Sequence, residues 1–283
     1  MLSYRHAFHA GNHADVLKHL VLVNTLHYAT RKPAPMFYLD THAGAGLYRL
    51  KSDEALQTGE AAKGVQKLDF KALQAAMTDD AKEALQRYMQ AVMPYLQRDS
   101  YPGSPLIAAG VLRKQDHLQL CELHPTDFER LQHYTHKDER VTCEQLDGYH
   151  RALALLPPAQ KRAVVLIDPS YEIKDDYRKV AKLVADIYQR MRAAQILLWY
   201  PVVERNDIDR MLGALQRTEV RDLWQCELGV APDQSGHGLT ASGMLLVNPP
   251  FTLPTQLRAL LPAIQQQLAP AFGHWLVKNL IPE

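Results

Sequence analysis

Four acidic residues follow four separate apolar runs of the sequence. They are Asp40, Glu122, Asp147 and Asp168. In open α/β sheets ligands bind just beyond the carboxyl ends of the strands, and carboxylates at that edge accept hydrogen bonds from hydroxyl and amino groups. The pattern therefore predicts a site for a ligand rich in such donors, such as a nucleoside.

The segment 164–171 reads Val-Val-Leu-Ile-Asp-Pro-Ser-Tyr and joins an apolar run directly to an acid, a proline and an aromatic residue. The apolar run is typical of a parallel strand that is buried on both faces. Asp168 would then face a crevice at the tip of that strand. Taken alone, the same residues also fit a strand that ends in an ordinary Asp-Pro turn.

A glycine-containing loop follows the first predicted strand, residues 35–40. Thr41 is followed by His-Ala-Gly-Ala-Gly, so Gly44 and Gly46 could let the backbone turn sharply and approach a ligand. The third glycine of the dinucleotide fingerprint is missing, because Arg49 stands in its place. By itself the loop is as typical of a plain turn as of a nucleotide site.

Strands that alternate with helices predict an α/β fold with a mostly parallel, doubly wound sheet. Two final strands joined by a loop indicate an antiparallel edge. Besides 35–40 and 164–167, the expected strands are 118–122, 140–143, 196–200, 225–230 and 243–247, and the expected helices include 12–29, 177–192 and 255–268.

Residues 51–100 differ from the rest, since they are charged, rich in alanine and without a strand-like run. Asp79 or Asp80 could cap a helix there, and just after this segment Ser104 could cap another that starts at Pro105. We expect a small helical insertion subdomain at 51–100 and a main domain built from 1–50 and 101–283.

Composition excludes several classes of protein. A net charge of +1 over 283 residues argues against a large surface that coats nucleic acid nonspecifically.

The three cysteines are far apart, which argues against zinc clusters and a disulfide framework. No run approaches the ~18 apolar residues of a membrane span. His9 and His13 have a metal-ligand spacing, but Gly11 interrupts it, and no third ligand is evident. We expect a cytoplasmic monomer without membrane or metal.

Several blocks of the chain together resemble the bacterial 23S ribosomal RNA adenine-N6 methyltransferases of the RlmJ type, once described as proteins for the catabolism of external DNA. The resemblance spans nearly the whole chain, and the N-terminal block is its most specific part. The blocks are residues 3–6, 9–19, 39–46, 101–108, 122–125, 199–203 and 240–244.

This resemblance implies a Rossmann-like class I enzyme that uses S-adenosyl-L-methionine to methylate an adenine of 23S rRNA. It also implies roles for individual residues. The residues implied for cofactor binding are His19, His42, Gly44, Gly46, Ser104, Glu122, Asp147, Gly148 and Asp168; those implied for catalysis are Asp168, Pro169, Tyr171 and Tyr4; those implied for substrate contact are Lys18, Tyr4 and Tyr171.

The chemistry of these residues is consistent with that expectation. The N6 amino group of adenine is a poor nucleophile, because its lone pair is delocalised into the ring. Hydrogen bonds from N6 to the Asp168 carboxylate and the Pro169 carbonyl would localise and orient that pair. Tyr171 would stack on the adenine after it has left its helix.

Ser170 departs from the family pattern, which has a second proline at that position. The loss loosens the loop by up to about 1 kcal/mol, so we expect reduced but not abolished activity. A more literal copy of the pattern, residues 248–251 (Asn-Pro-Pro-Phe), follows the last predicted strand at an expected sheet edge. We interpret that copy as a strand terminator.

Two alternatives remain open from the sequence. One is a DNA adenine-N6 methyltransferase, because a flipped adenine presents the same edge in either polymer. The other is a catalytically impaired nucleic-acid-binding protein. The basic residues that could contact phosphates, or simply lie on a solvated surface, are Arg31, Lys32, Lys161, Arg162, Lys174, Arg178 and Lys179.

Overall fold

A computed structural model of the chain describes residues 4–173, 175–233 and 238–283. Its strands are β1 (Phe37–Asp40), β2 (Leu47–Arg49), β3 (Ser100–Pro102), β4 (His117–Cys121), β5 (Val141–Glu144), β6 (Ala163–Ile167), β7 (Gln195–Val202), β8 (Leu223–Gly229), β9 (Ala241–Val247) and β10 (His274–Ile281). Its helices are η1 (His6–Phe8), α1 (His13–Ala29), α2 (Asp53–Thr58), α3 (Glu60–Lys63), η2 (Val65–Lys67), α4 (Phe70–Ala75), α5 (Asp79–Leu96), α6 (Ser104–Val111), α7 (Pro125–Thr135), α8 (Gly148–Leu155), α9 (Asp176–Arg190), α10 (Arg205–Gln216) and α11 (Leu253–Leu268).

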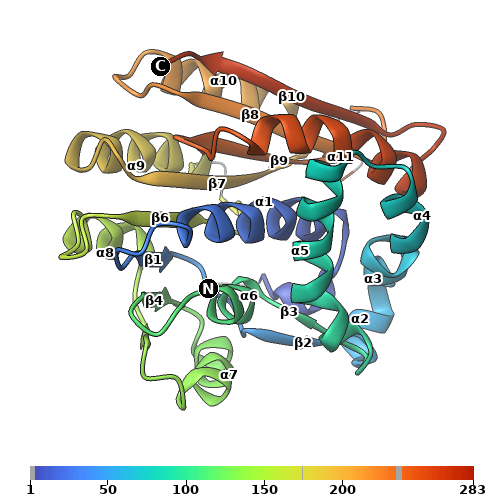
Figure 1. Cartoon of the computed structure of the whole chain (residues 1–283), viewed down its shortest axis with the longest axis horizontal. Coiled ribbons are helices and arrows are strands. Elements are labelled where there is room, and N and C mark those ends of the chain that lie inside the picture. The colour runs from blue at the N-terminus through green and yellow to red at the C-terminus, as the bar shows by residue number, and fades with distance from the viewer. Residues whose placement is uncertain (1–3, 174, 234–237) are drawn as a thin grey trace.

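The main sheet has the order β10-β8-β9-β7-β6-β1-β4-β5 (Figure 1). The strands from β5 to β7 are parallel, whereas β9 is antiparallel to both of its neighbours and β10 is antiparallel to β8. This confirms the expected mixed sheet with an antiparallel edge. The edge strand itself is β10, which the sequence analysis did not predict.

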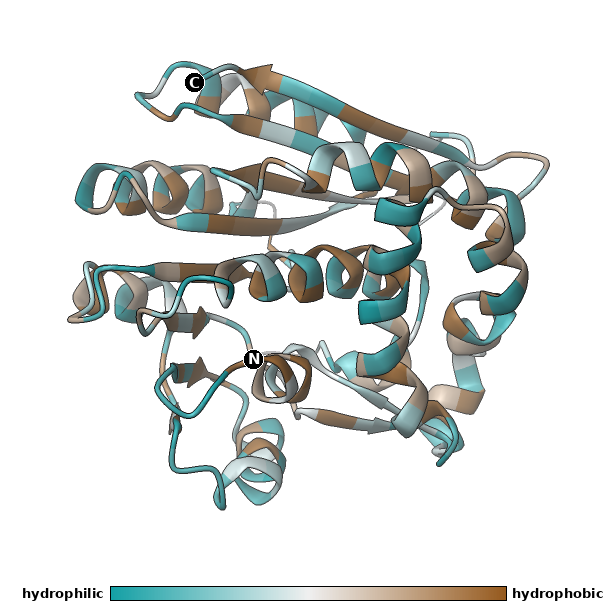
Figure 2. Ribbon diagram, viewed as in Figure 1, coloured by the Kyte–Doolittle hydropathy of each residue, from teal (hydrophilic) through white to brown (hydrophobic). Residues whose placement is uncertain are grey.

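Strand β6 shows why the sheet is buried on both faces. Successive side chains of a strand point to opposite faces. Val164 and Leu166 pack with α1, α5, α6 and α11 in one core cluster, and Val165 and Ile167 pack with α8, α9 and α10 in another. In Figure 2 the central strands are mostly brown, while α9 alternates between brown and teal, as expected for a helix with one buried face.

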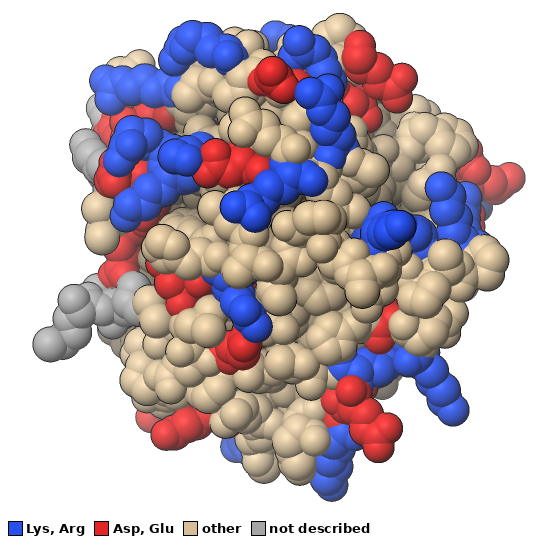
Figure 3. Space-filling view, turned by 90° about the vertical axis from the view of Figure 1, so that its left-hand side faces the viewer, with Lys and Arg blue, Asp and Glu red and all other residues tan. Residues whose placement is uncertain are grey.

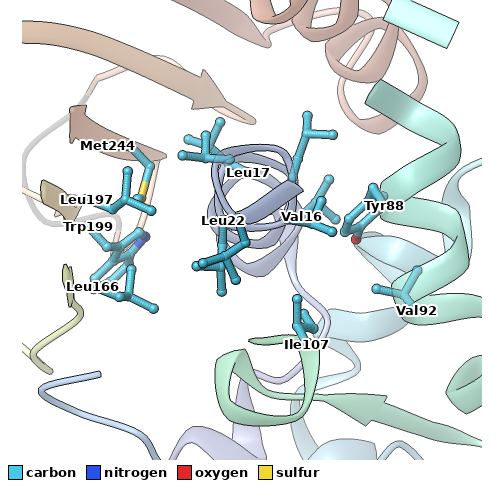
Figure 4. Close-up of a cluster of buried hydrophobic side chains, with 14 of the residues drawn as sticks. Val16, Leu17, Leu22, Tyr88, Val92, Ile107, Leu166, Leu197, Trp199 and Met244 are labelled. Carbon is cyan, nitrogen blue, oxygen red and sulfur yellow. The ribbon is translucent and has the colours of Figure 1, made fainter. Parts of the chain in front are cut away.

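Helix α1 is buried on nearly all sides. Asn12 caps its start by accepting a hydrogen bond from the Asp15 amide. Figure 4 shows the reason for the burial, since side chains of the sheet lie on one side of α1 and side chains of α5 and α6 lie on the other. The helices of residues 51–100 therefore contribute to the same core as the sheet.

Several expected boundaries shift by one or a few residues. Thr78, with extended backbone, is the residue before α5, so Asp79 and Asp80 lie in the first turn and do not cap it. Gly103 precedes α6, and the Ser104 side chain instead donates to Asp40.

Pro201 does not end its strand, because β7 continues to Val202 through its pairing with β9. Residues 248–251 do follow β9, but β9 lies between β7 and β8 and is not an edge. Because β9 is antiparallel, its end lies beside the start of β7, at the opposite edge of the sheet from Asp168. Within the described residues, no helix combines the length and the apolar character that a membrane span needs.

Candidate active site

A cavity of about 660 Å³ opens at the carboxyl ends of β1, β4, β5 and β6, which are neighbours in the sheet. This volume is in the range of small-molecule and cofactor sites. Most of the residues predicted from the sequence line it, namely Tyr4, Lys18, His19, His42, Gly44, Ser104, Glu122, Asp147, Gly148, Asp168 and Pro169. Four separate strand tips thus contribute to one cavity.

The glycine loop, residues 41–46, is hydrogen-bonded to Glu122, which directly follows β4. The Gly44 amide donates to Glu122 Oε2 over 2.7 Å, and the His124 amide donates to Glu122 Oε1 over 2.7 Å. Gly44 has a φ of +62°, and a Cβ there would lie 2.2 Å from the Tyr48 hydroxyl. Glycine is therefore required at this position for both conformation and space. Burial raises the pKa of Glu122.

Asp147 and Gly148 form the start of α8. Asp147 accepts a 2.8 Å hydrogen bond from the Tyr149 amide and so caps the helix, while its side chain remains about half exposed at the cavity. A Cβ at Gly148 would lie 2.0 Å from the Thr41 carbonyl oxygen. The backbone of α8 can approach the glycine loop this closely only because residue 148 is glycine.

Two histidines of the cavity are held neutral by their surroundings. Burial lowers the pKa of His19 to about 3 and that of His42 to about 4. His19 shares a 2.9 Å hydrogen bond with Tyr101, and His42 shares one of 2.8 Å with Thr41. Each ring can thus act as a neutral hydrogen-bonding group toward a ligand.

Asp168 lies directly after β6 and is paired with Lys18 of α1. The Lys18 ammonium is 2.7 Å from Asp168 Oδ2 and 2.9 Å from Asp15 Oδ1. Burial raises the pKa of Asp168, and the Lys18 charge opposes that rise. Burial would lower the pKa of Lys18, but the two carboxylates together hold it well above its ordinary value. The site therefore contains a charged lysine between two carboxyl groups.

Tyr4 lines the cavity, whereas Tyr171 and Gly46 do not, and neither does Asp40, the first of the four predicted strand-tip acids, which is fully buried. The Tyr4 hydroxyl is 2.8 Å from His6 Nδ1, and its ring stacks on His9. Tyr171 is turned inward, with its hydroxyl bonded to the Trp199 carbonyl oxygen. Gly46 has its carbonyl oxygen bonded to the Gly103 amide.

The sequence analysis missed several residues of the cavity. Among them, the Tyr149 hydroxyl and His124 Nδ1 are buried and have no hydrogen-bond partner within the described residues. Unpartnered buried polar atoms are costly in a folded protein, so their presence in the wall fits a cavity built for a polar ligand. Tyr149 directly follows the predicted Gly148, and His124 lies two residues after the predicted Glu122, so closeness in the sequence was the available signal. His6, Tyr48 and Trp199 also line the cavity.

The two histidines with metal-ligand spacing have other surroundings. His9 Nδ1 is 2.8 Å from Glu60, and burial lowers the pKa of His13 to about 4. Among the described residues, no group of three or more His, Cys, Asp or Glu side chains could hold a metal ion.

Some of the basic residues named as phosphate contacts are paired within the protein. Arg162 donates to the backbone carbonyls of Ala29 and Ala34, and Arg178 pairs with Asp175. Lys179 lines the cavity, and Lys174 lies outside the described residues. On the face shown in Figure 3, Asp and Glu side chains lie among the Lys and Arg side chains, so that face is not uniformly basic.

Comparison with known proteins identifies relatives of this chain. Residues 33–281 match the family described as "Ribosomal RNA large subunit methyltransferase D, RlmJ". The chain is 45% identical over 287 residues to Ribosomal RNA large subunit methyltransferase J of Escherichia coli (strain K12), and all of both chains is covered. It is 43% identical over 288 residues to the protein of the same name from Haemophilus influenzae, again with both chains fully covered.

A crystal structure of a protein from Legionella pneumophila str. Philadelphia 1 has the same fold. Its TM-score is 0.83 at 31% sequence identity, and the match covers 96% of this chain and 98% of that one. The sequence, the fold and the cavity at the carboxyl ends of the strands thus agree, and the chain belongs to the family of ribosomal RNA large subunit methyltransferase D, RlmJ.

Proposed function

We propose that this protein methylates N6 of an adenine in 23S rRNA with S-adenosyl-L-methionine as methyl donor. The observation that carries this proposal is the position of Asp168 and Pro169. They lie at the tip of β6, in the same cavity as the glycine loop, Glu122 and Asp147. Asp168 and the Pro169 carbonyl could accept hydrogen bonds from an amino group, and they lie beside the groups proposed to bind the cofactor.

The cavity fits the donor. The carboxylates of Glu122 and Asp147 are acceptors for ribose hydroxyls and an adenine amino group. Gly44 leaves room for close backbone approach, and His19, His42, Ser104 and Gly148 complete the proposed cofactor set. When bound, the cofactor supplies an electrophilic methyl group on a sulfonium centre.

The protein's own part in the reaction is to position and polarise the adenine. Asp168 and the Pro169 carbonyl accept hydrogen bonds from N6 and turn its lone pair toward the methyl group. The charge of Lys18 favours the ionised form of Asp168, and the ion pair fixes its orientation. Asp168 need not remove a proton before transfer, since the methylated amine is cationic and releases one readily. Tyr4 and Lys18 contact the substrate in this proposal.

Tyr171 stacks on the flipped base in this proposal, which requires it to leave the position described above. Gly46 then acts indirectly, by shaping the loop that carries Gly44. Residues 51–100 form an inserted helical subdomain on the methyltransferase domain of 1–50 and 101–283.

The finer features follow from the same chemistry. We propose that the protein acts as a monomer in the cytoplasm, where its RNA is. We also propose that no metal is needed, because the sulfonium already activates the methyl group. Light scattering, fractionation and assays with a chelator test these three points.

The test of the function is mass spectrometry of 23S rRNA from a deletion strain. One N6-methyladenosine should disappear and return when the gene is restored. Unchanged N6-methyladenosine would remove the substrate assignment. Competition between 23S rRNA and duplex DNA of equal adenine content distinguishes the DNA alternative, which predicts that DNA is the better substrate.

A further inference from the structure

The carboxylate of Asp15 is fully buried in the first turn of α1, where several groups converge on it. Asp15 Oδ2 accepts from the Gly11 amide over 2.8 Å and lies 2.9 Å from His6 Nε2. Its other oxygen, Oδ1, lies 2.9 Å from the Lys18 ammonium. Burial opposes ionisation, yet the charges of His6 and Lys18 hold the pKa of Asp15 well below its ordinary value.

Lys18 connects this buried carboxylate to the reaction centre. Its ammonium is shared between Asp15 Oδ1 and Asp168 Oδ2, and it lies 5.9 Å from the centre of the Trp199 ring. Because Lys18 takes Oδ2 of Asp168, Oδ1 is the oxygen that remains to accept from an amino group. Without Asp15, the Lys18 ammonium would pair with Asp168 alone. It could then contact both oxygens of Asp168 and compete there with the adenine amino group.

Other titratable groups that act on Asp168 or feel its charge come from several elements. They are Tyr4, His6, Tyr38, Asp40, Tyr149 and Tyr171. The two nitrogen bases near Asp168, Lys18 and His6, are both bonded to Asp15. A substitution of Asp15 therefore removes a charged partner from both Lys18 and His6.

We propose that Asp15 is a positioning residue for methyl transfer, which holds Lys18 between two carboxylates so that Asp168 keeps one oxygen free for the adenine amino group. The inference rests on the proposed function and deepens it. Asp15 touches neither substrate nor cofactor in this scheme, since Asp15 does not line the cavity, and it acts through Lys18.

Asp15 also helps to start α1, and Asn12 allows the two roles to be separated. The Asn12 side chain accepts from the Asp15 amide over 3.0 Å and donates to Glu60 over 2.9 Å. Asn12→Ala removes this cap and keeps the charge of Asp15. Asp15→Asn keeps the shape and an acceptor for the Gly11 amide but removes the charge.

The experiment measures rRNA methylation by wild type, D15N and N12A as a function of pH, together with cofactor affinity by calorimetry. D15N is expected to bind the cofactor as wild type does and to lose up to about 100-fold in kcat, the effect of a misplaced reacting group. The acid limb of its pH profile should move to lower pH, because the negative charge of Asp15 raises the pKa of Asp168. N12A should keep the wild-type kcat and pH profile and lose only thermal stability.

Three results would overturn the inference: wild-type kcat in D15N, an unmoved acid limb in D15N, or the same kinetic change in N12A. If D15N does not fold, D15E takes its place. D15E keeps the charge on a longer arm, so kcat should fall with the acid limb unmoved, and wild-type kcat in D15E would reject the role. The wild type reports separately on the proposed function, since an inactive wild type removes the function itself.

Discussion

The Tyr171 hydroxyl donates a 2.7 Å hydrogen bond to the backbone carbonyl of Trp199. The ring packs against Trp199 and Tyr177 and does not line the cavity. Tyr171 has a φ of +53°, a conformation that a tyrosine rarely adopts. A bulky residue held in this region beside an active site indicates stored strain, which a rearrangement on substrate binding could release.

Two replacements of Tyr171 should distinguish its hydrogen bond to Trp199 from its proposed stacking on the substrate base. Y171A should lower kcat/KM for RNA by about 5- to 150-fold, because stacking of a base on an aromatic ring contributes ~1–3 kcal/mol. Cofactor affinity should be unchanged. Y171F keeps the ring and loses only the bond to Trp199, so it should retain activity and lose about 1 kcal/mol of unfolding free energy. Wild-type kcat/KM in Y171A would show that Tyr171 does not stack on the substrate.

Asp168→Ala should abolish methyl transfer and spare the fold. Removal of a group that orients and polarises the reacting amine costs about 100-fold or more in kcat. The buried ammonium of Lys18 keeps Asp15 as a partner, 2.9 Å away, so no unpaired charge is left. Methylation kinetics and circular dichroism measure the two effects. Intact turnover in a folded D168A protein would refute the role of this acid.

The strand tips could be predicted from the sequence because they depend on local patterns. An apolar run that ends in an acid identifies β6 and Asp168 from neighbouring residues alone, and the same holds for β1 and β4. Close backbone approach at Gly148 depends on Thr41, more than one hundred residues earlier, so the sequence indicates the glycine but not what it contacts.

Features that depend on distant partners could not be predicted in the same way. The burial of α1 on every side requires α5, which comes from the insertion. The inward turn of Tyr171 requires a carbonyl on β7. Strand β10 was missed, and all of its residues are half-buried or exposed, so it lacks the buried apolar run that identifies strands such as β6. The pairing of Lys18 with both Asp15 and Asp168 depends on contact between α1 and the end of β6, which local sequence does not indicate.

Ser170→Pro should raise activity. The family pattern has proline at this position, and the ring would restrict the loop that leads to Tyr171. A restriction worth up to about 1 kcal/mol corresponds to an increase in kcat of up to about fivefold. Ser170→Ala is the matched control, because it removes the hydroxyl without adding the ring, and it should leave kcat unchanged. An equal rate in S170P and S170A would show that the missing proline does not limit the reaction.

Tyr149→Phe should weaken cofactor binding without loss of stability. The hydroxyl is buried in the cavity wall beside His42 and has no partner within the described residues, so a bound ligand is its natural partner. Loss of one hydrogen bond of ~0.5–1.5 kcal/mol should raise the cofactor Kd about 2- to 12-fold. Calorimetry measures this, with Y134F, on the half-exposed Tyr134 of α7, as control. Equal affinity in Y149F and wild type would contradict the assignment.

Asp40→Asn should flatten the dependence of stability on pH. Asp40 is fully buried and accepts hydrogen bonds from Tyr38 and Ser104, and burial raises its pKa from 3.8 to about 6. A raised pKa means that the folded state holds this proton more tightly than the unfolded state. The contribution of Asp40 is therefore fully present below pH 3.8 and is lost as the pH rises through about 6.

Above that window the loss amounts to roughly 3 kcal/mol of unfolding free energy, and an asparagine, which cannot ionise, does not incur it. Urea unfolding at a series of pH values from 4 to 8 should show a steeper decline in wild type than in D40N. D79N is the matched control, since Asp79 is fully exposed and should leave the slope unchanged. Parallel curves for wild type and D40N would mean that Asp40 is already ionised at low pH in the folded protein, and that its hydrogen bonds outweigh its burial.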